Sequence, residues 1–252
     1  MRVLAVDTTS EQGGAAVYDQ NECLAIALNE EPASRYAVTL FGLVERALAQ
    51  ARIGFPDIEL YAVSNGPGSF TGIRVGLAAA QGWGRAFAKP VKGVTLLEAM
   101  VEHAHPDSDW AVPVLDAHRG EFYVSFYRRM AGAAGHPVRF ESAGPGQLVH
   151  PERFKTLLEA LGRGGQCRTF SGGTISFLTR AHDLKARSLR ESLSPELVGI
   201  DVPGALLEAI ARVALRAHEQ GDVASPEELD ACYIRRPDAE VNVRPPVAKA
   251  GN

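Results

Sequence analysis

The stretch VLAVD, Val3–Asp7, decides the fold of this 252-residue sequence, because a second stretch, VPVLD at Val112–Asp116, repeats its pattern. Each is a short apolar run that ends in an aspartate, which is typical of a buried strand. In each case a turn and a further strand follow. The repetition predicts an α/β protein with two lobes built on one plan.

A glycine-rich turn follows each of these units. The turn after the second unit is predicted at the end of a strand over residues 167–173 (CRTFSGG). A carboxylate at a strand end can hold hydrated Mg²⁺, and glycine turns let backbone N–H groups approach phosphates. Alternatively, the aspartates cap turns and the glycines supply positive φ. The sequence leaves both interpretations open. The first would make a nucleotide cleft, working or vestigial, from Asp7, Thr8, Thr9, Asp116, Gly172 and Gly173.

The loop VSNGPGSFTGIRVG, Val63–Gly76, joins a predicted strand to a helix and is rich in glycine, serine and threonine. It is not a Walker loop, because no lysine follows the glycines. Its spacing also differs from that of the GxSxG nucleophile elbow. We therefore expect Ser69 or Thr71 to cap the helix and not to act as a nucleophile.

Two long helices are predicted in the first lobe, over residues 33–52 and 69–88. In the second helix a stripe of small residues recurs every four positions and so lies on one face: Gly72, Gly76, Ala80 and Gly84. Glycine inside a helix costs about 1 kcal/mol relative to alanine, so the stripe indicates close approach of another backbone. That backbone belongs either to the same chain or to a partner, and the pattern favours neither.

Composition and charge exclude several classes of protein. The chain is 46% apolar with a net charge of −4, which is typical of a globular protein and argues against a nucleic-acid surface over the whole molecule. Three cysteines without a CxxC motif predict a reducing compartment and no zinc ribbon. The histidines form no HExxH or HxxxH array, so we expect no metal site. The first apolar run is too short for a signal peptide and no segment is long enough to span a membrane, so we expect a cytoplasmic protein.

Four motifs together resemble the TsaB (YeaZ) family of the glycoprotease-like, or TsaD-like, superfamily: VLAVDTTS, SNGPGSFTGIRVGLAAAQGWGRAF, VLDAHRGEFYVSFY and CYIRRPDAE. The match covers nearly all of residues 1–127 and the segment near 230–240, whereas 130–225 matches in outline only. The resemblance implies an actin/Hsp70-like (ASKHA, ribonuclease H-like) two-lobed fold with duplicated mixed-sheet lobes.

We expect the chain to divide into an N-terminal lobe, 1–105, and a C-terminal lobe, 106–236. A strongly amphipathic helix predicted over 203–219 is a candidate to pack back on the N-terminal lobe. The tail, 237–252, lacks periodicity and is expected to be extended or mobile.

The resemblance also implies a function, the synthesis of N6-threonylcarbamoyladenosine at position 37 of tRNA. It implies a non-catalytic subunit that dimerises with TsaD, the subunit that transfers threonylcarbamoyl, while the ATPase TsaE completes the assembly. Isolated chains would form homodimers, and tRNA would be contacted only through the complex. The chain itself would require no cofactor, and binding of ATP or ADP stays open.

TsaD-type relatives carry an HxxxH metal pair on the first helix, and the corresponding helix here, SRYAVTLFGLVE, has no histidine. This counts against metal-dependent catalysis. Two alternatives remain, a phosphotransferase that uses Asp7 and Asp116, and a glycoprotease-like metallopeptidase. In the family the first two long helices pair with those of TsaD or of a second copy. The expected partner interface consists of Tyr36, Leu40, Leu43, Val44, Ala47, Gly72, Ile73, Gly76, Ala80, Trp83 and Gly84.

Overall fold

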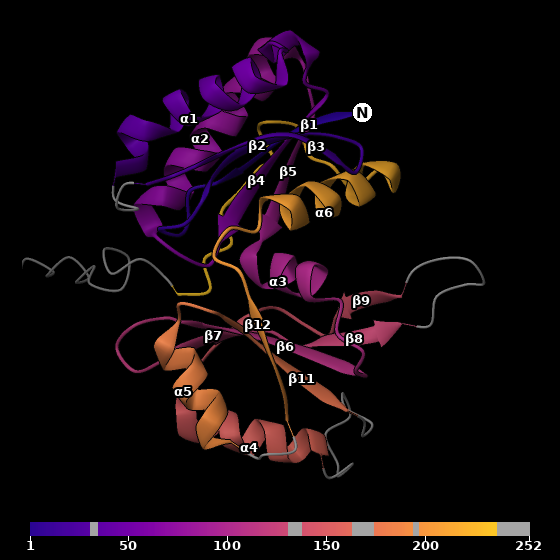
Figure 1. The fold of residues 1–252 in the computed structure, drawn as a ribbon. Helices are drawn as coiled ribbons and strands as arrows, with labels where there is room; N and C mark the ends of the chain where they lie inside the picture. Colours follow the sequence, from indigo (N-terminus) through magenta and orange to yellow (C-terminus); the bar gives the residue numbers. More distant parts are fainter. Residues whose placement is uncertain (31–34, 131–137, 163–173, 194–196, 236–252) are drawn as a thin grey trace, which may run out of the picture.

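The computed structural model describes residues 1–30, 35–130, 138–162, 174–193 and 197–235. Two α/β lobes are stacked one above the other, each around one mixed sheet (Figure 1). The N-terminal sheet has the strand order β3-β2-β1-β4-β5. Its strands are β1 (Arg2–Asp7), β2 (Gly14–Asp19), β3 (Glu22–Leu28), β4 (Leu60–Gly66) and β5 (Val91–Thr95).

The C-terminal sheet has the order β10-β7-β6-β11-β12, and β8 pairs with both β6 and β9. In each lobe the central strand, β1 or β6, pairs antiparallel with the next strand and parallel with a later one. The predicted duplication and the actin/Hsp70-like fold are confirmed by this topology. The strands are β6 (Trp110–Asp116), β7 (Phe122–Val124), β8 (Tyr127–Met130), β9 (Arg139–Ser142), β10 (Gln147–Val149), β11 (Ile175–Arg180) and β12 (Val198–Val202).

The strands that pair in parallel with β1 and β6 occupy equivalent places in the two lobes. The parallel neighbour of β1 is β4, which ends at Gly66, but the parallel neighbour of β6 is β11, which begins at Ile175. The strand predicted over 167–173, with Gly172 and Gly173, lies outside the described residues. The residue that ends β11, as Gly66 ends β4, is Arg180.

Six α-helices of the described residues cover the sheets. α1 (Tyr36–Ala51) and α2 (Phe70–Phe87) lie side by side on the outer face of the N-terminal sheet, and α4 (Pro151–Gly162) and α5 (Leu184–Ser192) cover the far face of the C-terminal sheet (Figure 1). The predicted helices over 33–52 and 69–88 are thus confirmed except at their ends.

Two further helices lie between the sheets, α3 (Leu96–Ala104) and α6 (Leu207–Glu219). α6 contacts β1, β2, β4 and β5 as well as α3. The apolar core around these helices includes side chains of both sheets, among them Val3 and Leu178. The two lobes therefore share one core, which spans the layer between them.

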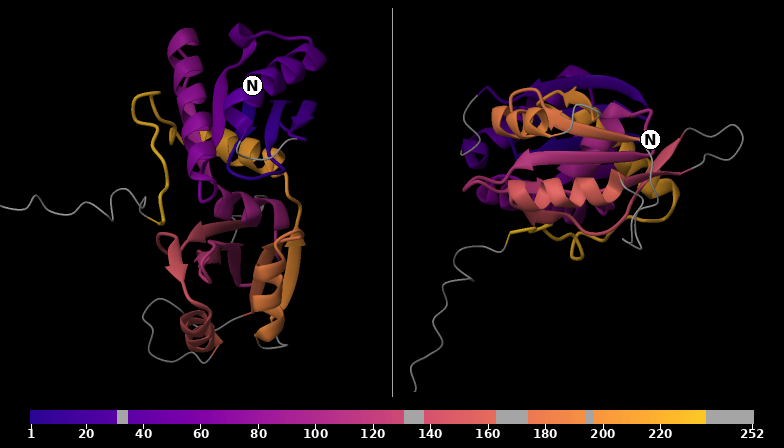
Figure 2. Two further views of the ribbon diagram at one scale, coloured as in Figure 1. Left: turned by 90° about the vertical axis from the view of Figure 1, so that its left-hand side faces the viewer. Right: turned by 90° about the horizontal axis from the view of Figure 1, so that it is seen from below.

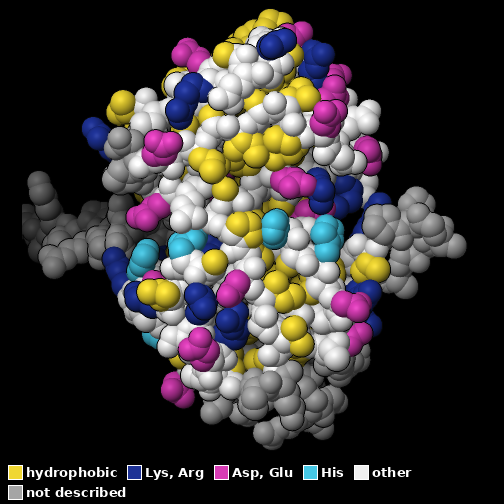
Figure 3. Space-filling model, in the orientation of Figure 1, with side chains coloured by type: hydrophobic (Ala, Val, Ile, Leu, Met, Phe, Trp, Pro, Cys, Tyr) yellow, Lys and Arg dark blue, Asp and Glu magenta, His cyan; other side chains and the backbone are white. Residues whose placement is uncertain are grey.

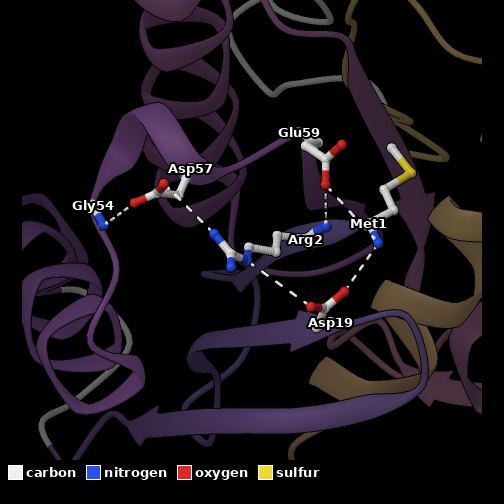
Figure 4. Close-up of polar contacts among 6 residues, drawn as sticks. All are labelled: Met1, Arg2, Asp19, Gly54, Asp57 and Glu59. Carbon is white, nitrogen blue, oxygen red and sulfur yellow. Dashed lines mark hydrogen bonds and ion pairs between the residues drawn. The ribbon is translucent and has the colours of Figure 1, made fainter.

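Ion pairs tie down the start of β1, at the end of the strand opposite to Asp7 (Figure 4). The Met1 ammonium group lies 2.9 Å from Asp19 Oδ1, and the Arg2 backbone N–H donates to Glu59 Oε2 at 2.8 Å. Arg2 Nη1 lies 3.5 Å from Asp57 Oδ1. These groups are partly exposed, so each pair is worth at most about 1 kcal/mol. Their role is to hold β1 in place between β2 and β4.

The segment 222–235, here called the C-terminal strap, runs beside α2 and on to the C-terminal lobe (Figure 2, left). Ala224 forms a two-bond bridge with Val91 of β5. Further along, the Cys232 N–H donates to the Asn65 carbonyl at 2.9 Å, and Arg235 Nη1 donates to the Ala117 carbonyl at 2.7 Å. The strap therefore links the last strands of the first lobe to the first turn of the second.

Candidate functional site

The residues predicted to form the partner interface are all buried within the single chain. They line the core between α1, α2 and the N-terminal sheet. These faces are covered within the single chain, because the apolar stripe of an amphipathic helix packs first on its own sheet. The buried residues are Tyr36, Leu40, Leu43, Val44, Ala47, Gly72, Ile73, Gly76, Ala80, Trp83 and Gly84.

The small-residue stripe of α2 meets the backbone that follows β1. A Cβ atom at Gly72 would lie 1.9 Å from the Thr8 carbonyl oxygen, and one at Gly76 would lie 2.4 Å from Thr8 Oγ1. Thr8 Oγ1 donates a hydrogen bond to the Gly72 carbonyl at 2.7 Å. At the far end of the stripe, a Cβ at Gly84 would meet Val91 at 2.8 Å. The close approach indicated by the sequence is therefore made within the chain.

The opposite side of α1 and α2 carries exposed apolar and small residues beside charged ones such as Glu45 and Arg46. Val38 is 78% exposed and Phe41 is 55% exposed. A Cβ atom at Gly42 or at Gly82 would meet nothing within 4 Å. We call this surface the outer face, and it comprises Val38, Phe41, Gly42, Val75, Ala78 and Gly82.

A cleft of about 670 Å³ lies between the two lobes, at the carboxyl ends of β1, β6 and β11. Of the predicted cleft residues, Thr9 and Asp116 line it. Asp7 and Thr8 are buried beneath its wall. Histidine side chains gather where the lobes meet (Figure 3), and His118 and His182 belong to the cleft lining.

The Asp7 carboxylate is fully buried and accepts four hydrogen bonds. Its Oδ1 accepts from the Thr9 N–H at 2.9 Å, from Thr9 Oγ1 at 2.6 Å and from Ser64 Oγ at 2.6 Å. Its Oδ2 accepts from Ser10 Oγ at 3.2 Å and lies 3.8 Å from Arg180 Nη2. A carboxylate ligand of Mg²⁺ needs an oxygen free for the ion or its water. These contacts fit a structural anchor better than a metal ligand.

Asp116 holds its turn in the same way as Asp7. Its Oδ1 accepts from the N–H of His118, two residues on, at 2.8 Å, as Asp7 accepts from Thr9. Its Oδ2 lies 3.0 Å from Lys185 Nζ. Both aspartates therefore make the turn-capping hydrogen bonds that the second interpretation requires. The described residues bring together no cluster of three His, Cys, Asp or Glu side chains able to hold a metal ion.

The start of α2 is closed by the chain that follows β1. The Ser69 N–H donates to the Thr9 carbonyl at 2.9 Å, and a Cβ at Gly68 would lie 2.5 Å from the same oxygen. The Gly72 N–H donates to Ser69 Oγ at 3.2 Å. The glycine turn is thus packed against its own lobe and is not open to wrap a phosphate group. Among the described residues, which leave out Gly172 and Gly173, this turn and the two aspartates do not fit a bound Mg²⁺–nucleotide.

The cap of α2 yields a stability prediction. Ser69 is the N-cap and Thr71 is an exposed residue of the first turn. Ser69→Ala should lower the free energy of unfolding by about 1 kcal/mol, because the Gly72 N–H loses its acceptor. Thr71→Ala should change it by less than about 0.5 kcal/mol. Urea denaturation measures both, and equal losses would contradict the assignment of the cap.

Arg180 is a buried residue of the cleft that the sequence interpretation missed. It ends the apolar strand ISFLTR, as Asp7 ends RVLAVD, and it is 3% exposed. A charged residue that closes an apolar run was therefore a usable signal. Burial, and then the positive charge of Arg180, lower the pKa of the neighbouring His182.

Comparisons with known proteins agree with this architecture. The family model described as TsaD, tRNA N6-adenosine threonylcarbamoyltransferase, matches residues 29–228. The tRNA threonylcarbamoyladenosine biosynthesis protein TsaB of Escherichia coli K12 is 30% identical over 159 residues, which are 62% of this chain and 68% of that protein. The protein of the same name from Bacillus subtilis is 26% identical over 52% of this chain and 57% of its own length.

Among solved structures, YeaZ from Pseudomonas aeruginosa superposes with a TM-score of 0.70 at 21% identity. The superposition covers 92% of this chain and 99% of that one, and it shows that the fold is shared. Among the described residues, no helix combines the length and apolar content that a membrane crossing requires. The family model and the curated relatives together show that this chain belongs to the TsaB (YeaZ) family.

Proposed function

We propose that this chain takes part in the biosynthesis of tRNA N6-threonylcarbamoyladenosine as a non-catalytic subunit that dimerises with TsaD. The names of its relatives support the pathway. In this proposal TsaE joins the assembly, tRNA is reached through the complex, and isolated chains pair with one another through the surface that TsaD would otherwise cover.

The outer face of α1 and α2 is the observation that carries this proposal. Large apolar side chains exposed beside small residues are typical of a surface that another protein covers. Val38 and Phe41 would supply the apolar contacts, and Gly42, Ala78 and Gly82 would let a second helix pair approach to the usual interaxial distance of about 8–10 Å. Phe41 is held in place by an edge-to-face contact with Trp83, with ring centroids 5.9 Å apart.

The cleft supports a non-catalytic role. Asp7 and Asp116, the carboxylates that a phosphotransferase would need, are engaged in capping turns and in contacts with basic side chains. Preparing either one for catalysis would require breaking contacts that hold the strand ends. A subunit that contributes a surface instead of a reacting group accounts for both the cleft and the outer face.

A charge on the outer face should prevent association with TsaD. Phe41→Asp places a carboxylate on a surface that must be desolvated, so the complex with TsaD should weaken at least about 100-fold, or about 2.7 kcal/mol. The matched control is Val198→Asp, because Val198 is 54% exposed but lies on β12 of the other lobe.

The experiment mixes the purified chain with TsaD and measures the mass of the complex by light scattering. A 1:1 mass for the wild type and for Val198→Asp, but not for Phe41→Asp, is the expected result. Circular dichroism must show that Phe41→Asp is folded. A folded Phe41→Asp chain that still binds TsaD with the wild-type affinity would place the interface elsewhere.

A further inference from the structure

Arg180 is a buried cation with two nitrogen atoms that find no hydrogen-bond acceptor among the described residues. The residue is 3% exposed, yet its Nε and Nη2 make no hydrogen bond to any other described residue. Its nearest acidic group, Asp7 Oδ2, lies 3.8 Å from Nη2, beyond hydrogen-bond distance. A buried donor without an acceptor destabilises the folded state, and more so when it is charged. An arrangement of this kind calls for an acceptor that is not part of the chain.

Arg180 lies where that acceptor can be supplied. It lines the cleft together with hydroxyl-bearing residues of the opposite lobe, Ser10 and Ser69, and with Lys185 of its own lobe. A ligand in the cleft can therefore touch both lobes at once. The 670 Å³ of the cleft is enough for a small metabolite.

The charges around the cleft define the class of ligand. Arg180 and Lys185 are the cations, but Glu11, Asp116 and Asp183 also line the cleft and Asp7 lies directly behind it. A polyanion such as a nucleoside triphosphate would be repelled by each of these carboxylates at close range. A single negative charge placed against the guanidinium meets less of this repulsion. A planar guanidinium pairs with the two oxygens of a carboxylate through two parallel hydrogen bonds.

We propose that the cleft between the lobes binds a small monocarboxylate, whose carboxylate accepts hydrogen bonds from the Arg180 guanidinium while Ser10 and Ser69 contact it from the other lobe. This site is separate from the outer face, and it does not depend on the proposed association with TsaD. It differs from a nucleotide site, because the anchor is an arginine of the second lobe and not a metal-binding aspartate or a phosphate-binding glycine turn.

The arginine Nε–H resonance of the ¹⁵N-labelled, full-length chain tests the proposal directly. Sodium acetate is the probe, titrated against sodium chloride at constant ionic strength. The Arg180 resonance should move along a saturating curve with acetate and should stay in place with chloride. Inorganic phosphate and magnesium ATP are separate arms and should produce a smaller shift or none. A saturating response to phosphate or ATP at lower concentration than acetate would overturn the carboxylate assignment.

Two variants supply a second readout, the rise in thermal unfolding temperature with acetate. Arg180→Lys keeps the positive charge but loses the planar guanidinium that can donate two parallel hydrogen bonds, so the acetate affinity should fall at least tenfold. Arg212→Lys is the matched control, because Arg212 lies on α6 and pairs with Glu208 outside the cleft. If both variants respond to acetate as the wild type does, or if the resonance shifts linearly with every salt, the proposal is wrong. The resonance titration uses the wild-type chain, so it tests acetate binding at Arg180 even if the Arg180→Lys variant does not fold.

Discussion

Gly72→Ala is expected to lower the free energy of unfolding by at least about 3 kcal/mol, the upper end of the usual cost of overpacking. The new Cβ atom would lie 1.9 Å from the Thr8 carbonyl oxygen and 2.9 Å from its carbon. Both are backbone atoms, so no side-chain rotation can relieve the contact. Because a domain has only about 5–15 kcal/mol of stability, the variant should lose a large part of it.

Gly82→Ala is the matched control for this prediction. Gly82 belongs to the same helix, but a Cβ atom there meets nothing within 4 Å. Alanine is favoured over glycine in a helix by about 1 kcal/mol, so Gly82→Ala should raise stability by up to that amount. Urea denaturation of both variants measures the difference. If Gly72→Ala were as stable as Gly82→Ala, the packing of α2 on Thr8 would be wrong.

Leucine substitutions on the two sides of α2 separate effects on stability from effects on association. Gly82 lies on the outer face, so Gly82→Leu should weaken binding to TsaD while the chain stays folded. Gly76→Leu should act on the fold, because the added group would meet Thr8 and Val63 in the core. A loss of the complex in Gly76→Leu alone would therefore not identify an interface.

The small-residue stripe of α2 shows what a helical sequence pattern can predict and what it cannot. Periodicity predicts which residues share a face of α2, and the cost of glycine predicts that a backbone comes close. Neither says which backbone, because that depends on the path of the chain after β1, far away in the sequence. The same limit applies to the residues predicted to face a partner, which are buried in the core. Val38 and Phe41 differ from Leu40 and Leu43 in exposure and not in hydrophobicity, and only the packed structure distinguishes them.

The strands were more predictable than the site. Apolar runs that end in an aspartate are buried central strands in both lobes, so β1 and β6 and their duplication follow from the sequence. The function of the aspartates does not follow from it. A strand-end carboxylate can hold a metal or cap a turn, and the outcome depends on neighbours such as Ser64 and Arg180, which arrive from other strands.

Asp7→Ala is the second large effect that we expect, a loss of about 3–5 kcal/mol in the free energy of unfolding, because it leaves a buried charge without its partner. Arg180 would keep its charge in the core, and the Thr9 N–H and Ser64 hydroxyl would lose their acceptor. Asp116→Ala is the control, since the Asp116 side chain reaches the cleft and pairs with the exposed Lys185. Its loss should be about 1 kcal/mol, the value of a cap.

The double variant Asp7→Ala/Arg180→Met tests the cause of that loss. If the main cost is the uncompensated guanidinium, removing both charges should recover at least about 1 kcal/mol relative to Asp7→Ala alone, a coupling within the usual range for residues in contact. Strictly additive losses in urea denaturation would show that Asp7 does not stabilise Arg180. Asp7 is assigned here to the fold and not to chemistry. The Asp7→Ala chain should therefore still bind TsaD at temperatures where it remains folded. If Asp7 were instead a catalytic residue, Asp7→Ala would abolish the reaction at every temperature without lowering stability to this extent.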